Sequence, residues 1–582
     1  MTPAITPAAS QHSGATKPPR GGQGRVPRGR SLQHLASLLG RYRWSATAVF
    51  LACLLSLPLS AVMAIALHGD GGAWRHLLAT VLPNSFSNTL LLIMGAGLLA
   101  SAIGTGAAWI VTMYRFRGRD LADRLLILPL AIPLYIAAYA YADFLDYAGP
   151  VQSAIRRAFG FKQASDYFFP DVRSLGGAVL MFSVVLYPYV YLLARASFEQ
   201  QSVCALEVAR TLGASARETF WRVALPLARP SIAAGCALVL MECLNDLGAV
   251  QYLGVDTLSA SIFATWQQRG DLPGAAQIAV VMLMFVGALL VLENRARGAA
   301  STHATTGRYR AIPFETLKGS RAAAALTLIL VPVVLGFVIP VFVLAERAWL
   351  HLGNADIPAF LRAAFNSLIL ASLASVAALT CAIVFAYAVR LEPNCASRTA
   401  NRVAGLGYAL PGTVLAIGVL SPLAAVDNSI DAALRDHFGV SPGLVLSGSL
   451  FAVTIALVIR FLSVALGAVD AGLQKISPNL DAASRTLGAT SSSALLRVHF
   501  PMLMPAIGTA ALLVFVDAMK ELPATLLLRP FNFQTLATHV YALTATEQLE
   551  EAALGALTIV AIGLIPVLAL HKTIANGRAG HS

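Results

Sequence analysis

EVARTLGA, residues 207–214, occurs a second time in this chain as AASRTLGA, residues 482–489. In each copy a proline follows the glycine by thirteen residues, Pro226 in the first copy and Pro501 in the second. The offset between the copies is 275 residues throughout. Two copies of one polar segment, nearly half a chain apart, predict two equivalent halves.

Each copy is typical of a helix–turn–helix elbow. Gly213 can adopt the left-handed conformation that ends a helix. Ser215–Glu218 has the pattern of a capping box that begins a second short helix, and Pro226 is expected to end it. In the second copy Thr490 or Ser491 is the expected N-cap. One isolated copy could be a plain connector between spans, whereas two copies with equal spacing favour a shared function.

The composition is that of a polytopic membrane protein. Of the 582 residues, 57% are hydrophobic and 12% are charged, against about 25% charged in average soluble domains. The net charge of +13 lies in short segments beside apolar runs, which argues against nucleic-acid binding and follows the positive-inside rule. The six cysteines have no metal-ligand or redox spacing.

Twelve apolar runs are long enough for membrane-spanning helices, which need about 20 residues. The expected fold is therefore an all-α polytopic membrane protein. The expected spans are 44–68, 88–113, 125–146, 175–196, 230–250, 274–292, 322–346, 366–390, 402–424, 443–469, 506–522 and 552–571.

The spans divide the chain into five parts. Residues 1–43 are expected to form a disordered, basic cytoplasmic tail. Residues 44–292 form a first repeat of six spans, residues 293–321 a polar cytoplasmic linker, and residues 322–572 a second repeat of six spans. Residues 573–582 are a cytoplasmic tail.

The distribution of Lys and Arg places both elbows, the linker and both termini in the cytoplasm. Segment 147–174 falls on the outer side although it carries four basic residues. Because it also carries acidic residues, we interpret it as a small external element.

The repeat extends beyond the elbows. Asn88, Pro133 and Thr257 return 278 residues later as Asn366, Pro411 and Thr535. An even number of spans in each half makes the repeats parallel, so that a pathway is expected at their interface.

Ionisable residues within the apolar runs also occur in pairs at the 275-residue offset. Glu242 and Asp246 have the i, i+4 spacing of one helical face, and Asp517 and Glu521 correspond to them. Acids in hydrocarbon usually face a bundle interior or a watery path, although structural acids bonded to neighbouring helices explain them equally well. The candidates for the translocation pathway are Glu242, Asn245, Asp246, Asp517, Lys520 and Glu521.

The two elbows resemble the EAA loop of ABC importer permeases. In that family the loop is the coupling helix, which docks into a cytoplasmic ATPase subunit. The matching residues are Glu207, Ala209, Gly213 and Pro226 in the first half, and Ala483, Gly488 and Pro501 in the second. Ala482 stands where the family has Glu, and Asp481 is the nearest acid. The second loop therefore departs from the family pattern at this position, and equal and asymmetric coupling of the two halves both stay open.

Segments 245–254 and 520–537 are similar to the corresponding segments of ferric-iron ABC importer permeases. The resemblance implies a fused permease with two six-helix repeats of the type I ABC importer kind, in a bacterial inner membrane. It implies two cytoplasmic ABC ATPase subunits and an external solute-binding protein as partners, with ferric iron as solute. Closely similar permeases serve 2-aminoethylphosphonate, thiamine or polyamines. No cofactor, bound metal or catalytic residue is expected.

Two other classes of function remain open. An ion-coupled secondary transporter would also suit twelve spans in two parallel halves, with the intramembrane acids carrying protons. A non-transport scaffold would leave those acids without a role. The chain has no Gly-x-x-x-x-Gly-Lys-[Ser/Thr] motif, so that an ATPase must be a separate chain, and dependence of uptake on ATP or on proton-motive force separates the classes.

Overall fold

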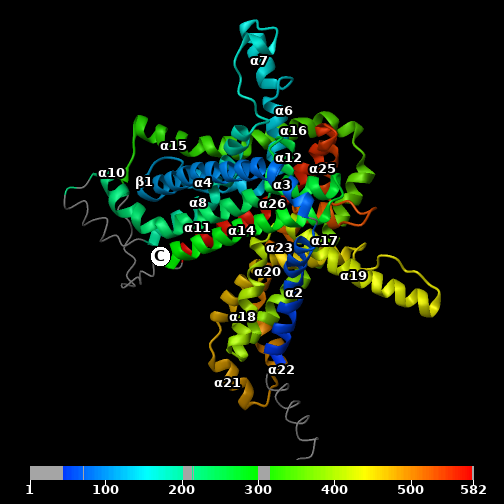
Figure 1. Ribbon diagram of the computed structural model, residues 1–582. Coiled ribbons are helices and arrows are strands. Elements are labelled where there is room, and N and C mark those ends of the chain that lie inside the picture. The colour runs from blue at the N-terminus through cyan, green and yellow to red at the C-terminus, as the bar shows by residue number, and fades with distance from the viewer. Residues whose placement is uncertain (1–42, 70, 201–212, 214, 299–314, 580–582) are drawn as a thin grey trace, which may run out of the picture.

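The computed structural model describes residues 43–69, 71–200, 213, 215–298 and 315–579 (Figure 1). Residues 1–42 of the predicted tail and residues 299–314 of the predicted linker lie outside this description. Within it, eleven helices are long and apolar enough to cross a membrane, and one bent helix pair makes a twelfth crossing. The predicted all-α polytopic membrane fold is confirmed.

The first half contains six crossings and several short connecting helices. Its elements are α2 (Arg43–Leu67), α3 (Gly71–Thr80), α4 (Leu82–Met113), β1 (Tyr114–Arg115), α5 (Arg119–Leu125), η1 (Leu128–Ala131), α6 (Leu134–Leu145), α7 (Pro150–Phe159), η2 (Ala164–Asp166), α8 (Leu175–Gln200), α10 (Ala216–Thr219), η3 (Phe220–Ala224), α11 (Leu225–Asn245), α12 (Gly248–Tyr252), α13 (Leu258–Phe263), η4 (Ala264–Gln268) and α14 (Leu272–Gly298).

The second half repeats this order with few changes. Its elements are β2 (Glu315–Thr316), α15 (Gly319–Val333), η5 (Val334–Val338), α16 (Ile339–His351), η6 (Leu352–Asn354), α17 (Ile357–Leu391), α18 (Cys395–Ala404), η7 (Gly407–Ala409), α19 (Gly412–Phe438), α20 (Leu450–Gln474), α21 (Asn479–Thr486), α22 (Ser491–Ala494), η8 (Leu495–His499), α23 (Phe500–Met519), α24 (Pro523–Leu528), α25 (Leu536–Ala545) and α26 (Leu549–Ala579).

The third span of each half is broken at a proline. The segment before Pro133 and the helix after it meet at 97°. Proline restricts the residue before it to extended conformations, and Ile132 accordingly has φ −96° and ψ 118°. In the second half Leu410 before Pro411 is extended in the same way. The single helices predicted over 125–146 and 402–424 are therefore wrong in this detail.

The first helix of each half packs against the other half. α2 contacts α17, α18 and α19 as well as α14, and α16 contacts α6 as well as α26. The Glu392 carboxylate accepts hydrogen bonds from the backbone N–H groups of Trp44 (3.3 Å) and Ser45 (2.9 Å). A carboxylate is favourable at a helix N-terminus because the exposed N–H groups carry partial positive charge.

The start of the second half is held by the first half in turn. β1 and β2 pair in parallel, with Tyr114 opposite Glu315 and Arg115 opposite Thr316. The two halves therefore interlock at both of their beginnings.

Close helix contacts depend on small residues, as is common between helices in membranes. At Gly104 of α4, a Cβ atom would lie 2.7 Å from the backbone oxygen of Tyr187 in α8. Any side chain at this position would push α4 away from α8. α8 is the fourth crossing, and it lines the cavity described below.

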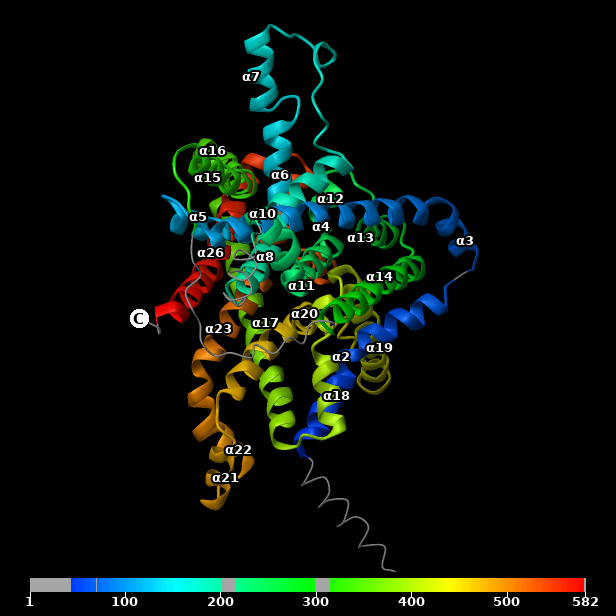
Figure 2. The same cartoon turned by 90° about the vertical axis from the view of Figure 1, so that its left-hand side faces the viewer.

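The two ends of the molecule differ in what they carry. Both views place α7 at one end and α21 with α22 at the other (Figures 1 and 2). The predicted external element, residues 147–174, is thus a projection that lies far from the second elbow. α14 and α26 continue as helices beyond the predicted ends of their repeats, to Gly298 and Ala579.

Candidate translocation site

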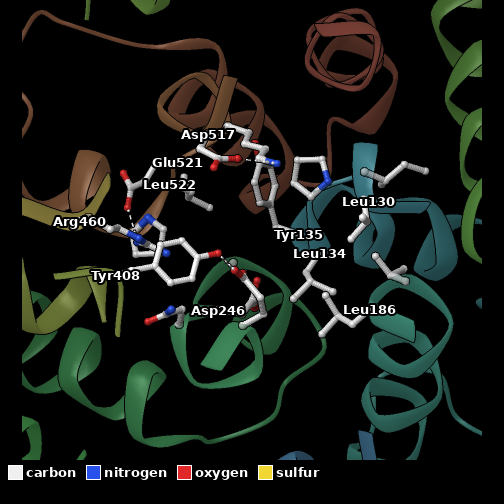
Figure 3. Close-up of a pocket in the computed structure, with 18 of the residues that line it drawn as sticks. Leu130, Leu134, Tyr135, Leu186, Asp246, Tyr408, Arg460, Asp517, Glu521 and Leu522 are labelled. Atoms are coloured by element: carbon white, nitrogen blue, oxygen red, sulfur yellow. Dashed lines mark hydrogen bonds and ion pairs between the residues drawn. The ribbon is translucent and has the colours of Figure 1, made fainter. Parts of the chain in front are cut away.

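Residues of both halves enclose a polar cavity of about 120 Å³ (Figure 3). The first half contributes residues of η1, α6, α8, α11 and α12, and the second half contributes residues of η7, α20 and α23 with the segment that follows α23. A water molecule needs about 10–15 Å³ of cavity volume, when the volume is that open to the centre of a water-sized sphere. The cavity can therefore hold an ion with several waters.

All six residues predicted for the pathway line this one cavity. They are Glu242, Asn245, Asp246, Asp517, Lys520 and Glu521. Residues that are 275 positions apart in sequence are thus brought together in space by the two repeats.

Asp246 does not continue the helical face of Glu242, as the i, i+4 spacing predicted. α11 ends at Asn245, and Asp246 is extended, with φ −73° and ψ 135°. Its carboxylate accepts hydrogen bonds from the N–H groups of Ala249 (2.9 Å) and Val250 (3.1 Å). Asp246 therefore caps the short helix α12, as polar side chains do at helix starts.

Glu521 repeats this arrangement in the second half. It accepts hydrogen bonds from the N–H groups of Ala524 (2.8 Å) and Thr525 (2.9 Å) at the start of α24. In addition, Arg460 Nη1 lies 3.0 Å from Glu521 Oε1, and both side chains are almost fully buried. A buried charge of this kind is tolerated because it is paired.

The other two carboxylates differ in their partners. Asp517 forms an ion pair with Lys520 at 3.0 Å, whereas Glu242 accepts a hydrogen bond of 2.9 Å from the hydroxyl of Tyr408. Within the part of the chain that the structure describes, neither Glu242 nor Asp246 has an ion-pair partner. Four carboxylates and two cations line the cavity, which gives it a formal charge of −2, and the unpaired acids belong to the first half.

Sequence reasoning missed Arg460 and the cavity tyrosines. Arg460 interrupts the apolar run of α20. An ionisable residue inside a membrane span is by default a functional candidate, so that the sequence did contain a signal for Arg460. Tyr135 lines the cavity with a buried hydroxyl that has no hydrogen-bond partner among the described residues, and the same holds for the amide oxygen of Asn245. Both oxygens are thus buried polar atoms beside the cavity that no described residue satisfies.

The first elbow is only partly described. Glu207 and Ala209 lie outside the described residues, while Gly213 has the predicted positive φ of 87°. The predicted capping box is confirmed: the N–H of Ser215 donates to Glu218 (2.9 Å), and the N–H of Glu218 donates to the Ser215 hydroxyl (3.3 Å).

The second elbow is described in full. α21, which contains Ala483, ends before Gly488, whose φ is 76°. Thr490 is the N-cap of α22 and accepts from the N–H of Ser493 (3.3 Å). Leu487, at the tip of the elbow, is 86% exposed.

The prolines after the elbows do not end a helix. Pro226 and Pro501 lie in the first turns of α11 and α23, and each is preceded by a five-residue π-helical turn, η3 or η8. A wider turn removes the clash between the proline ring and the preceding turn that would otherwise break a helix. The stop predicted at Pro226 is therefore wrong, and in each half helical structure continues from the elbow into the fifth span.

Asp481 faces the interior of the second elbow. Its carboxylate lies 2.9 Å from Arg390 Nη2 and 2.8 Å from His499 Nε2. Arg390 also donates to the backbone oxygens of Leu473 (2.6 Å) and Ile476 (3.1 Å). Asp481 thus fastens the elbow to α17 and to the π-helical turn η8, which differs from the contact with an ATPase that the EAA resemblance implies.

Two interlocked repeats of membrane-crossing helices around a polar cavity define a transport permease. The family model for "Binding-protein-dependent transport system inner membrane component" matches residues 100–296. The Haemophilus influenzae "Fe(3+)-transport system permease protein FbpB 2" is 25% identical over 492 residues, which cover 84% of this chain and 89% of that protein.

Two further relatives align with fewer residues. The Escherichia coli "Sulfate transport system permease protein CysT" is 31% identical over 242 residues, covering 40% of this chain and 84% of the relative. The Escherichia coli "Molybdenum transport system permease protein ModB" is 28% identical over 210 residues, covering 35% of this chain and 88% of the relative. The chain belongs to the family of binding-protein-dependent transport system inner membrane components and is a multi-pass permease of an ABC importer.

Proposed function

We propose that the chain is the fused permease of a ferric-iron importer. An external binding protein delivers the ion, and two cytoplasmic ATPase subunits, one at each elbow, drive its passage. ATP hydrolysis belongs to those subunits, and this chain supplies the route.

The charge of the cavity is the observation that carries the assignment to a cation. Four carboxylates face two basic side chains, and Glu242 and Asp246 have no cationic partner among the described residues. A ferric ion prefers hard oxygen ligands, and the cavity offers carboxylate, phenol and amide oxygens. An oxyanion such as sulfate would instead require hydrogen-bond donors and excess positive charge.

The relatives support the same solute. The iron permease of Haemophilus influenzae covers most of this chain, whereas the sulfate and molybdenum permeases cover 40% and 35% of it. 2-Aminoethylphosphonate, thiamine and polyamines are the other solutes that this machinery would suit, and the transport assay below separates them.

The proposed orientation places both elbows and both termini in the cytoplasm of a bacterial inner membrane. The basic residues of the second elbow support it, since Arg485 lies between two crossings and Arg497 lies in the first turns of the second of them. The assigned parts are a first repeat over residues 44–292, a linker over 293–321 and a second repeat over 322–572.

The proposed mechanism is alternating access. ATP binding brings the two ATPase subunits together and moves the elbows at Gly213 and Gly488 toward each other. Because each elbow continues through a π-helical turn into its fifth span, the movement tilts α11 and α23. These two helices carry the cavity acids Glu242 and Asp517, so that tilting them opens the cavity outward.

The test is uptake by proteoliposomes that contain this chain, its ATPase and its binding protein. We expect ATP-dependent uptake of ⁵⁵Fe(III), insensitive to a protonophore, and no uptake of ³⁵S-sulfate, molybdate or 2-aminoethylphosphonate. Uptake of an oxyanion in preference to iron would overturn the solute. Uptake that follows the proton gradient without ATP would instead identify an ion-coupled secondary transporter.

A further inference from the structure

Each half sends one projection out of the helix bundle. Projection 1 is residues 147–174, with α7, and projection 2 is residues 424–449, with the last part of α19. In Figure 1, α7 rises at the top and the end of α19 extends to the right, away from α10 and α21. Both projections follow the proline-broken third span and precede the fourth, so that they are equivalent elements of the two repeats.

The projections lie on the membrane side opposite the elbows. A single crossing, α8, separates projection 1 from the first elbow, and a single crossing, α20, separates projection 2 from the second. With the elbows in the cytoplasm, as the proposed function requires, both projections face the outside.

Projection 1 has a defined structure held by polar contacts. The Tyr167 hydroxyl donates to Gln152 (2.6 Å), and the Arg156 guanidinium lies 4.0 Å from the centre of the Tyr147 ring. The Asp166 carboxylate accepts from the N–H groups of Gln163 (2.9 Å) and Lys162 (2.8 Å), and these bonds hold the pKa of Asp166 below its usual value.

Projection 2 is held by a different aspartate. The Asp427 carboxylate accepts hydrogen bonds from the N–H groups of Leu446 (2.8 Å) and Ser447 (2.7 Å). These bonds hold the segment that leads back to α20 against α19. Each projection is therefore a preformed surface.

Both surfaces expose large apolar side chains. Phe168 is 93% exposed and Phe159 is 73% exposed in projection 1, and Phe438 is 75% exposed in projection 2. In projection 1 the rings of Phe159, Phe161 and Tyr167 are stacked in a row. Grouped exposed apolar side chains with a polar rim are typical of protein-binding surfaces.

The two surfaces carry opposite charge. Projection 1 has four basic and two acidic residues, and projection 2 has one basic and three acidic residues. They are Arg156, Arg157, Lys162, Arg173, Asp166 and Asp171 in projection 1, and Arg435, Asp427, Asp431 and Asp436 in projection 2. The formal charges of the two segments are thus +2 and −2, with histidine neutral. Asp427 is buried, so that Arg435, Asp431 and Asp436 leave a charge of −1 on the surface of projection 2. Basic residues normally concentrate on the cytoplasmic side, so that an outer cluster of them calls for a specific role.

We propose that the two projections dock the solute-binding protein and set its orientation. The partner presents an acidic, partly apolar surface to projection 1 and a basic, partly apolar surface to projection 2. Two equivalent halves would accept a partner in either of two orientations, and unlike charges on the projections favour one because the reversed partner meets like charge on both sides. The inference rests on the proposed function, since it requires an importer with an external binding protein.

The test reverses charge at exposed side chains. The probe is the binding protein that supports uptake by the wild-type transporter in proteoliposomes, titrated against the transporter in nanodiscs. We expect R157E/K162E and D436K each to weaken binding about tenfold at low salt, and the wild-type affinity to fall as salt rises. R362E, an exposed charge at the start of α17 outside both projections, is the matched control and should bind as the wild type does.

A second measurement identifies the orientation directly. A photocrosslinking residue in place of Phe168 should attach to an acidic patch of the binding protein, and one in place of Phe438 to a separate basic patch. Wild-type affinity in both charge-reversed variants, or crosslinks from both positions to one patch, would overturn the docking inference while iron uptake continued. Absence of ATP-dependent uptake by the wild type would overturn the proposed function instead.

Discussion

Tyr408 of the second half donates a hydrogen bond of 2.9 Å to the Glu242 carboxylate of the first half. Both residues line the cavity, so that the bond joins the two repeats at the site that we propose as the route of the solute. Any outward opening that separates α11 from the second half must lengthen or break it. The pair is therefore placed to couple the solute site to the conformational change.

The first prediction concerns this bond. Hydrogen bonds to charged groups contribute about 1.5–3 kcal/mol, and Y408F removes the donor. We expect Y408F to open more readily and to raise ATP hydrolysis by the complex in the absence of binding protein several-fold. E242Q keeps an acceptor oxygen, so that its basal ATPase activity should rise less, while its iron uptake should fall more. Equal basal ATPase activity in Y408F and the wild type would contradict this role.

Arg460 and Glu521 provide a second prediction. Removing one partner of a buried ion pair costs about 3–5 kcal/mol, because the other charge is left unpaired. R460M should therefore lower the Tm of the detergent-solubilised protein more than R460M/E521Q does. The pair of Asp517 and Lys520, whose side chains are 28% and 26% exposed, is the matched comparison: K520M should change the Tm less, since solvent partly screens that pair. A Tm of R460M/E521Q below that of R460M would contradict the pairing argument.

The third prediction separates the two roles of Asp246, its negative charge in the cavity and its capping of α12. Asn caps helices about as well as Asp, whereas Ala costs about 1 kcal/mol. D246N should keep the wild-type Tm and lose iron uptake, and D246A should lose both. Wild-type uptake of iron by D246N would show that the charge of Asp246 is not required, and would weaken the assignment of a cation as solute.

How far the sequence predicts this site depends on where helices end. The apolar runs and the 275-residue repeat located six cavity residues, because burial of apolar surface and repetition are visible in a single sequence. The end of α11 at Asn245 was not predicted, since the break depends on Asp246 finding the N–H groups of Ala249 and Val250. This capping is local, since the donors lie only three and four residues after Asp246, so that Asp246 was a readable helix-start signal that the i, i+4 interpretation overlooked.

Two features needed the three-dimensional structure. The π-helical turns before Pro226 and Pro501 allow a helix to pass through a proline that local propensity treats as a stop. The packing of α2 against the second half and of α16 against the first half cannot be read from the hydrophobic pattern. A helix that faces lipid and a helix that packs on the other repeat are equally apolar. Glu392, which caps α2 from the second half, is likewise 347 residues away from Ser45 in sequence.

The elbow glycines give a fourth prediction. Gly488 has φ 76°, and a Cβ atom there would meet no heavy atom within 4 Å. The cost of G488V is therefore conformational, about 1–2 kcal/mol for a left-handed residue with a side chain, and leaves membrane insertion intact. We expect G488V, and likewise G213V, to abolish uptake in vesicles that contain normal amounts of the protein.

The control for the elbow is Gly467 of α20. A Cβ atom at Gly467 would also meet no heavy atom within 4 Å, but this glycine lies within a helix and lacks positive φ. G467A should transport normally. Normal uptake by both G213V and G488V would show that the elbows do not couple ATP hydrolysis to transport.

Arg390 gives the last prediction, on how the second elbow transmits force. Its guanidinium joins Asp481 of the elbow to the backbone oxygens of Leu473 and Ile476 at the end of α20. Lys has one compact charge and no planar fork, so that R390K cannot reproduce these contacts. We expect both R390M and R390K to assemble with the ATPase and hydrolyse ATP, but to import fewer ions for each ATP. R398M, which changes an exposed arginine of α18, should keep the wild-type ratio. Asp481 stands one residue before the position where the EAA pattern has glutamate, so that its pairing with Arg390 is the contact under test. An unchanged number of ions imported per ATP in R390M would mean that the second elbow is held by its contact with the ATPase alone.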